Sequence, residues 1–330
     1  MLISTVLSEE KPALAAIPVL IVALALAPQV VAESTLITLI TVLMYATLTL
    51  SWTMFSGPTG YVSLATAALF GIGVYVAALL RDGLPIELIV LVGGAVAFLV
   101  AAAIGVLTLR LRGVYFILFT FGVTALIRNT VHWWEANVSG TVGRHVTGAT
   151  NGTVYLLLMI LFSAALVGGF LLRHSSVGLA LQAIGENQDA AEHIGIDVIR
   201  VKVLTFAASA VLIGATGAVM ATRLSYIDPS IAFNPLISFL PVVMAILGGV
   251  SRLYGPLLGA TLLVVLQEFL ITEYPHVYLL LFGLVLVAVV LWLPGGLVVL
   301  AQRNYFRLKV RWIRLRMRIS RLRRIRQASR

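Results

Sequence analysis

This sequence lacks cysteine and has few charged residues. It contains no cysteine, and 11% of its 330 residues are charged, against 60% that are hydrophobic. Soluble domains carry about 25% charged residues, so the composition predicts a protein that lies in lipid. No stretch is polar enough to form a separate soluble domain. The absence of cysteine excludes disulfides, thiol catalysis and cysteine-based metal sites.

Ionisable residues are also missing from the middle of the apolar runs. Hydropathy predicts about ten membrane crossings, and none has Asp, Glu, Lys, Arg or His near its centre. Because an ionisable group at bilayer depth usually marks a proton or ion relay, a pump, a proton-coupled carrier and an intramembrane hydrolase are all disfavoured. We expect no catalytic residues. Energy for uphill transport would have to come from another polypeptide, and a passive channel is the alternative.

The expected fold is an all-α polytopic membrane protein with some helices broken or re-entrant. Nineteen of the 23 Lys and Arg residues fall on one side if the polar segment 173–202 is cytoplasmic. This positive-inside bias places both termini in the cytoplasm. The expected spans are Ala13–Val31, Leu36–Trp52, Tyr61–Leu80, Glu87–Leu109, Val114–Val131, Thr153–Leu172, Val203–Ala221, Leu236–Val250, Pro256–Ile271 and Val277–Leu293.

The net charge of +10 comes from one end of the chain. Residues 303–330 hold twelve Lys and Arg and no acid. Apolar residues recur there at spacings of three and four, which predicts an amphipathic helix on anionic lipid and not a nucleic-acid surface. We therefore expect a transmembrane domain over 1–301 and a basic cytoplasmic tail over 302–330. The first apolar run lacks a positive flank, which favours a retained span over a signal peptide.

Glycine is concentrated in one apolar segment that also carries hydroxyl groups. Pro58 and its neighbouring glycines interrupt a helix there, and broken backbone at membrane depth is tolerated only against protein or a water-filled path. Packing alone is the alternative for each glycine, since small residues let helices approach closely. We predict a substrate path lined by Gly57, Gly60, Tyr61, Ser63, Thr66, Gly71, Gly73 and Tyr75.

A polar segment, residues 173–202, separates two apolar spans and contains a short helix signal. Asn187 is a good N-cap candidate, and Asp189 lies in the first turn, where the helix dipole favours an anion. Gly195 can take the left-handed position that ends a helix. His193 stands near a single acid and is expected to be solvated, so no metal site is predicted. An ordinary surface helix is the alternative to a docking element.

Four blocks of sequence together resemble a known family. Gly60–Tyr75 resembles a G-x-x-S-L…F-G-I-G-A-Y segment, and Leu109–Tyr115 resembles an L-R-L-R-G-x-Y turn. Ala183–Lys202 resembles an A-I-R-E-N…A-A…G-I…K region, and Leu247–Ala260 an L-G-G…W-G-P-x-x-G-A block. In this order they are similar to the membrane subunit of branched-chain amino-acid ABC importers, of the LivM type.

The resemblance implies a permease without enzymatic activity in a prokaryotic inner membrane. Its partners would be a homologous second permease, two ATP-binding subunits that carry ATP and Mg, and a soluble solute-binding protein, with no cofactor on this chain. The family's E-A-A-x-x-x-G helix is matched with Asp for Glu, which implies ATPase coupling through Glu186, Asn187, Asp189, Ala190, Ala191 and Gly195. The implied substrates are branched-chain or other small neutral amino acids; urea, short amides and nucleosides are the alternatives.

Three positions and the tail depart from the family pattern. Thr66 stands where the family often has an imidazole and Ala65 where it often has glycine, which implies a different substrate if these positions line the path. The tail after Leu300 is longer and more basic than the family pattern implies. Gly185 replaces a common arginine at the start of the helix signal.

Overall fold

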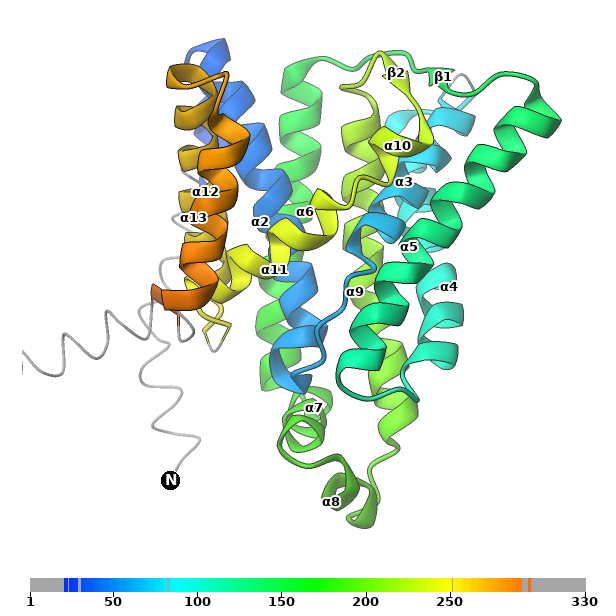
Figure 1. Ribbon diagram of the computed structural model, residues 1–330, viewed down its shortest axis with the longest axis vertical. Helices are drawn as coiled ribbons and strands as arrows, with labels where there is room; N and C mark the ends of the chain where they lie inside the picture. The colour runs from blue at the N-terminus through cyan, green and yellow to red at the C-terminus, as the bar shows by residue number, and fades with distance from the viewer. Residues whose placement is uncertain are drawn as a thin grey trace, which may run out of the picture.

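The computed structural model of the protein describes residues 21–22, 24–28, 31–81, 83–250, 252–292 and 296–297. The expected first span, Ala13–Val31, lies largely outside these residues, and the expected tail, 302–330, lies wholly outside them. The described chain is a bundle of long helices, with two short helices at one end (Figure 1). An all-α polytopic membrane protein is confirmed, and each of the other expected spans coincides with a described helix.

Within the described ranges, seven helical segments are long and apolar enough to cross a membrane, and α3 and α13 are shorter apolar helices. Two-residue strands, β1 and β2, form one antiparallel pair, Arg144 opposite Ile227 and His145 opposite Tyr226. The helices are α2 (Glu33–Thr59), α3 (Thr66–Leu80), α4 (Ile86–Thr108), α5 (Val114–Trp134), η1 (Glu135–Ser139), α6 (Asn151–His174), α7 (Ser176–Glu186), α8 (Gln188–His193), α9 (Val198–Ala221), α10 (Pro229–Ala232), α11 (Leu236–Gly248), α12 (Tyr254–Glu273) and α13 (Tyr278–Trp292); the strands are β1 (Arg144–His145) and β2 (Tyr226–Ile227).

The expected span Tyr61–Leu80 becomes helical only at Thr66. The prediction that Pro58 interrupts a helix was wrong, since Pro58 lies within the last turn of α2. α2 ends at Gly60, which has a φ of 70°, and α3 begins only at Thr66. Residues 60–65, here called the connector, run in an extended form between the two helices (Figure 1). A second break separates α10 from α11 at residues 233–235.

Helix α9 is the centre of the bundle, and α5 lies at its edge. In its most apolar stretch, α9 is 72% buried, whereas the span that contains α5 is 22% buried. α9 packs closely on α3 and α4 through glycines: a Cβ on Gly73 would collide with the carbonyl of Gly214, and one on Gly214 with Ala97. α5 leans away from the other helices (Figure 1), which leaves an apolar face suited to lipid.

Gly73→Leu is expected to destabilise the protein because it forces apart helices whose backbones touch. Overpacking a tight core costs about 1–3 kcal/mol, so the melting temperature in mild detergent should fall. Gly122→Leu is the matched control, since a Cβ on Gly122 of α5 would meet nothing within 4 Å. Equal melting temperatures for the two variants would contradict close packing of α3 on α9.

Among the described residues, one carboxylate and one lysine are fully buried near the ends of their helices. Glu135, at the end of α5, lies 3.5 Å from Arg144 as an ion pair and accepts hydrogen bonds from Tyr75 and from the backbone N–H of Gly143. Lys202, in the second turn of α9, is the other. Both residues lie just outside the spans expected from the sequence. The observed helices are longer than those spans, so both residues lie within the packed bundle.

Candidate functional site

Hydroxyl and indole side chains from three helices satisfy the backbone of the connector. Trp52 of α2 donates to the carbonyl of Ser63 at 2.8 Å, and Ser238 of α11 donates to the carbonyl of Leu64 at 2.7 Å. The N–H of Leu64 donates to Thr120 of α5 at 3.1 Å. Since unpaired backbone groups in an apolar interior are costly, these side chains are what allow an extended segment to lie here.

A small cavity adjoins the connector and is lined by aromatic, aliphatic and hydroxyl side chains. Its volume is about 10 Å³, which is about the room that one water molecule needs. No solute of amino-acid size fits in this cavity. Ser56 is buried beside it and its hydroxyl has no hydrogen-bond partner in the described structure. The lining residues are Trp52, Phe55, Ser56, Ser63, Thr66, Leu69, Phe206, Ser209 and Ile213.

Of the predicted path residues, the structure places Ser63 and Thr66 at this cavity. Ser56 and Ser209 line it too and were missed; a hydroxyl inside an apolar helix was the available signal, but such groups also bond to their own helix. The others lie elsewhere. Gly57 faces Val250, Gly60 ends α2, Gly71 packs on Phe233, Gly73 packs on α9, Tyr75 bonds to Glu135, and Tyr61 bonds to Gln188.

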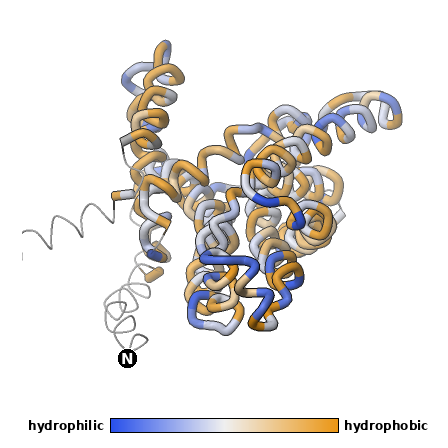
Figure 2. Tube along the Cα trace, turned by 60° about the horizontal axis from the view of Figure 1, so that its bottom comes forward, coloured by the Kyte–Doolittle hydropathy of each residue, from blue (hydrophilic) through white to orange (hydrophobic). Residues whose placement is uncertain are grey.

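The polar segment folds into α7 and α8 at one end of the bundle. Hydrophilic residues gather there, whereas the long helices are mostly hydrophobic (Figure 2). Asn187 caps α8 by accepting a hydrogen bond from the N–H of Ala190 at 3.1 Å, as predicted. Gly195 has a φ of 87° and ends the turn after α8, also as predicted. Glu186 is the exposed last residue of α7.

The two alanines of α8 differ in burial. Ala191 is buried against Ile184 and Val198, so it attaches α8 to α7 and α9. Ala190 is exposed, as is Asp189 beside it. Of the two alanines that the resemblance assigns to ATPase coupling, only Ala190 is therefore exposed for contact with a partner.

Gly185 is the point at which α7 meets the end of α2. A Cβ there would collide with the carbonyl of Pro58. This contact requires glycine at the position, because the backbone of α2 occupies the space that a side chain would need.

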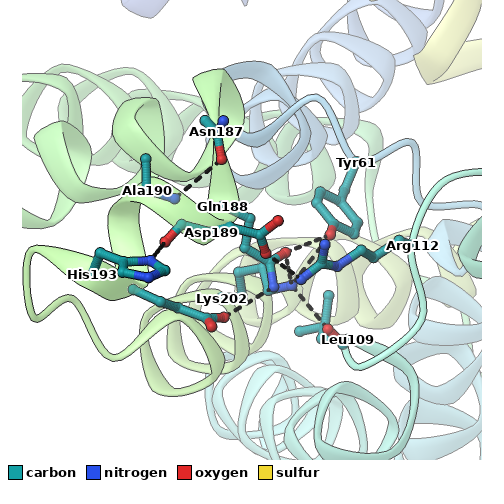
Figure 3. Close-up of polar contacts among 10 residues, drawn as sticks. Tyr61, Leu109, Arg112, Asn187, Gln188, Asp189, Ala190, His193 and Lys202 are labelled. Carbon is teal, nitrogen blue, oxygen red and sulfur yellow. Dashed lines mark hydrogen bonds and ion pairs between the residues drawn. The ribbon is translucent and has the colours of Figure 1, made fainter.

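Behind α8, Lys202 joins three separate parts of the chain (Figure 3). Its ammonium group donates to the carbonyl of Leu109 at 2.8 Å, to Oε1 of Gln188 at 3.2 Å and to the hydroxyl of Tyr61 at 3.4 Å. It also lies 4.4 Å from the centre of the Tyr61 ring, within cation–π range. The hydroxyl of Tyr61 donates to Oε1 of Gln188 at 2.8 Å. We call these four residues the Lys202 junction.

One exposed ion pair reinforces this arrangement. Arg112, in the turn between α4 and α5, lies 2.9 Å from Asp189 of α8. Its hydrogen bond to Asp189 and the charge of that carboxylate raise the pKa of Arg112 above its usual value. Exposed pairs contribute little to stability, so this pair orients α8 more than it stabilises the fold.

Blocks of sequence that are far apart thus meet at one end of the molecule. The connector supplies Tyr61, the L-R-L-R-G turn supplies Leu109 and Arg112, and the polar segment supplies Gln188 and Lys202. The fourth block also reaches this end, since Arg173 donates to the carbonyl of Val250 at 3.1 Å.

Residues 34–290 match the family described as branched-chain amino acid transport system, permease component. The chain belongs to this family. It is therefore the permease component of an ABC branched-chain amino acid transport system, a multi-pass membrane protein and a transport subunit without catalytic activity of its own. Membership also implies ATPase, binding-protein and permease partners.

The relatives include both permeases of one kind of transporter. LivM of Salmonella typhimurium, a high-affinity branched-chain amino acid transport system permease protein, is 24% identical, covering 77% of this chain and 68% of that protein. The corresponding LivH of Escherichia coli is 26% identical, covering 77% of this chain and 90% of that protein. The xylose transport system permease protein XylH of Haemophilus influenzae is 31% identical over 36% of this chain and 35% of its own. No solved structure matches.

Proposed function

We propose that this permease moves leucine, isoleucine or valine inward, driven by ATP that is hydrolysed on two partner subunits. The observation that carries the proposal is the pairing of a small, uncharged cavity with a preformed docking helix at one end of the bundle. The cavity is lined by aromatic, aliphatic and hydroxyl groups. Such a lining suits a solute with no net charge and an apolar side chain, since it offers no ion partner to a charged one.

The surface around α8 has the character of a protein-docking site. Ile194 is 74% exposed and Leu179 of α7 is 60% exposed, although both lie in the most polar part of the described chain. Exposed apolar side chains rimmed by polar groups mark interaction surfaces. Ala190 adds a narrow face next to them. We assign this face to a cleft of an ATP-binding subunit, through Glu186, Asn187, Asp189 and Ala190, with Ala191 and Gly195 fixing the shape of α8.

The complete transporter would contain a second, homologous permease, two ATP-binding subunits with ATP and Mg, and a soluble solute-binding protein. The end formed by α7 and α8 would face the cytoplasm of a prokaryotic cell, as the positive-inside bias predicts. The apolar outer faces of the helices, such as that of α5, would contact lipid. Nucleic acid has no part in this assembly.

The test is ATP hydrolysis and solute uptake by the complex reconstituted in proteoliposomes with its binding protein. Leucine, valine, urea and a nucleoside would be supplied in turn. We expect leucine or valine to stimulate both activities. If only urea or a nucleoside stimulates the two activities, the protein is still an ABC importer subunit, but its substrate is not a branched-chain amino acid. If no ATP-binding subunit co-purifies in gentle detergent and uptake proceeds without ATP, the protein is instead a passive channel.

A further inference from the structure

The complete burial of Lys202 is the feature that calls for a physical explanation. Lys202 has no exposed surface, and neither of the two ion pairs found among the described residues includes it. Burying a charge is costly unless it is well hydrogen-bonded. Its partners are three neutral oxygens, on Leu109, Gln188 and Tyr61, and one aromatic face. An apolar side chain would fill this position at less cost, so the charge points to a role beyond filling space.

Each of those oxygens belongs to a different element. Gln188 is the first residue of α8, Tyr61 is the second residue of the connector, and Leu109 follows α4. Figure 3 shows the side chains of Gln188, Tyr61 and Lys202 pointing toward one another. The docking helix is therefore held directly to the segment that leads into the cavity.

The connector is short and well held, so a displacement at Tyr61 reaches the cavity. Ser63 lies two residues after Tyr61 and lines the cavity, and its carbonyl is fixed by Trp52. Thr66, at the start of α3, lines the same cavity. Coupling between distant sites needs packed or hydrogen-bonded elements of this kind.

We infer that Lys202 is the positioning residue through which movement of α8 is passed to the connector and opens or closes the path. This inference rests on the proposed function, since it assumes that an ATPase moves α8. Lys202 touches neither the solute nor the nucleotide. It keeps Gln188 and Tyr61 in contact, so that the connector follows α8 and does not slip past it.

The experiment measures solute uptake and ATP hydrolysis in the same proteoliposomes, and the ratio of the two is the readout. Lys202→Met keeps the length and apolar stem of the side chain and removes its charge and donors. Tyr61→Phe keeps the ring and removes the hydroxyl. We expect uptake per ATP hydrolysed to fall by about 2- to 30-fold in each, the range over which single residues alter coupling. Arg200→Met, on the exposed surface of the same helix, is the matched control with an unchanged ratio.

The double variant Lys202→Met with Tyr61→Phe tests whether the two residues act together or independently of each other. If Lys202 and Tyr61 act together, the uptake-to-hydrolysis ratio of the double variant should equal that of the more affected single variant, because the effects of coupled residues are not additive. A normal uptake-to-hydrolysis ratio in both single variants would overturn the inference. So would parallel losses of uptake, hydrolysis and melting temperature, which would mean that Lys202 only supports the fold. A wild-type complex without ATP-driven uptake would instead overturn the proposed function.

Discussion

Ala190→Lys is expected to abolish ATP-driven uptake while leaving the permease folded. The Ala190 side chain is exposed on α8, so lysine fits on the free protein. In the docked complex the same charge would enter the cleft of the ATP-binding subunit without a partner. Burying an unpaired charge costs about 3–5 kcal/mol, so uptake should fall on the order of 100-fold or more. Uptake, co-purification of the ATPase and melting temperature would be measured together.

The neighbouring alanine supplies the contrast for this prediction. Ala191 is 1% exposed and packs on Ile184 and Val198. Ala191→Lys should therefore lower the melting temperature, whereas Ala190→Lys should not, and Ala190→Ser should behave as the wild type. The docking assignment fails if Ala190→Lys binds the ATPase and transports at the normal rate.

Thr66→Trp is expected to block the path and leave the ATPase bound. Thr66 is 2% exposed and lines a cavity of about 10 Å³. An indole there would fill the space through which a solute must pass and would obstruct it. Its bulk also overpacks the lining of the cavity, which costs about 1–3 kcal/mol of folding stability. Uptake should thus fall by about tenfold or more. Co-purification of the ATP-binding subunit should be normal, which distinguishes this variant from Ala190→Lys.

Two variants control for the size and the position of the new side chain. Thr66→Ser keeps the hydroxyl and adds no volume, so its uptake should stay close to normal. Gly122→Trp places the same indole where nothing lies within 4 Å of a Cβ, and it should transport normally. If Thr66→Trp has normal uptake and a normal melting temperature, the prediction that Thr66 lines the path is wrong.

Local signals in the sequence were sufficient to locate the helices and two of their end features, although α2 continues to Thr59 and α9 begins at Val198, beyond the expected ends. The expected span Pro256–Ile271 corresponds to α12, Tyr254–Glu273, and the cap at Asn187 and the left-handed Gly195 are both observed. These features depend on residues close together in the sequence, because capping acts within the first turn of a helix and hydropathy within about 19 residues. The break in the span after Gly60 was visible for the same reason.

The roles of individual glycines and alanines needed the tertiary structure. The sequence assigned Gly71 and Gly73 to the path, and the structure packs them on Phe233 and on α9. It treated Ala190 and Ala191 alike, and the structure exposes one and buries the other. In lipid, apolar residues cover the outside of a helix as well as its packed side. The pattern of apolar residues therefore does not say which side of a helix is packed.

By itself, the sequence determined that this is a helical membrane protein, which stretches of the chain form its apolar helices, and which family it resembles. Only the tertiary structure decided that the connector, the turn after α4 and the polar segment converge on Lys202, and that Ser63 and Thr66 meet at one small cavity. The physical reason is distance along the chain. Leu109 and Lys202 bond to each other 93 positions apart, and only the packing of the helices between them fixes that contact.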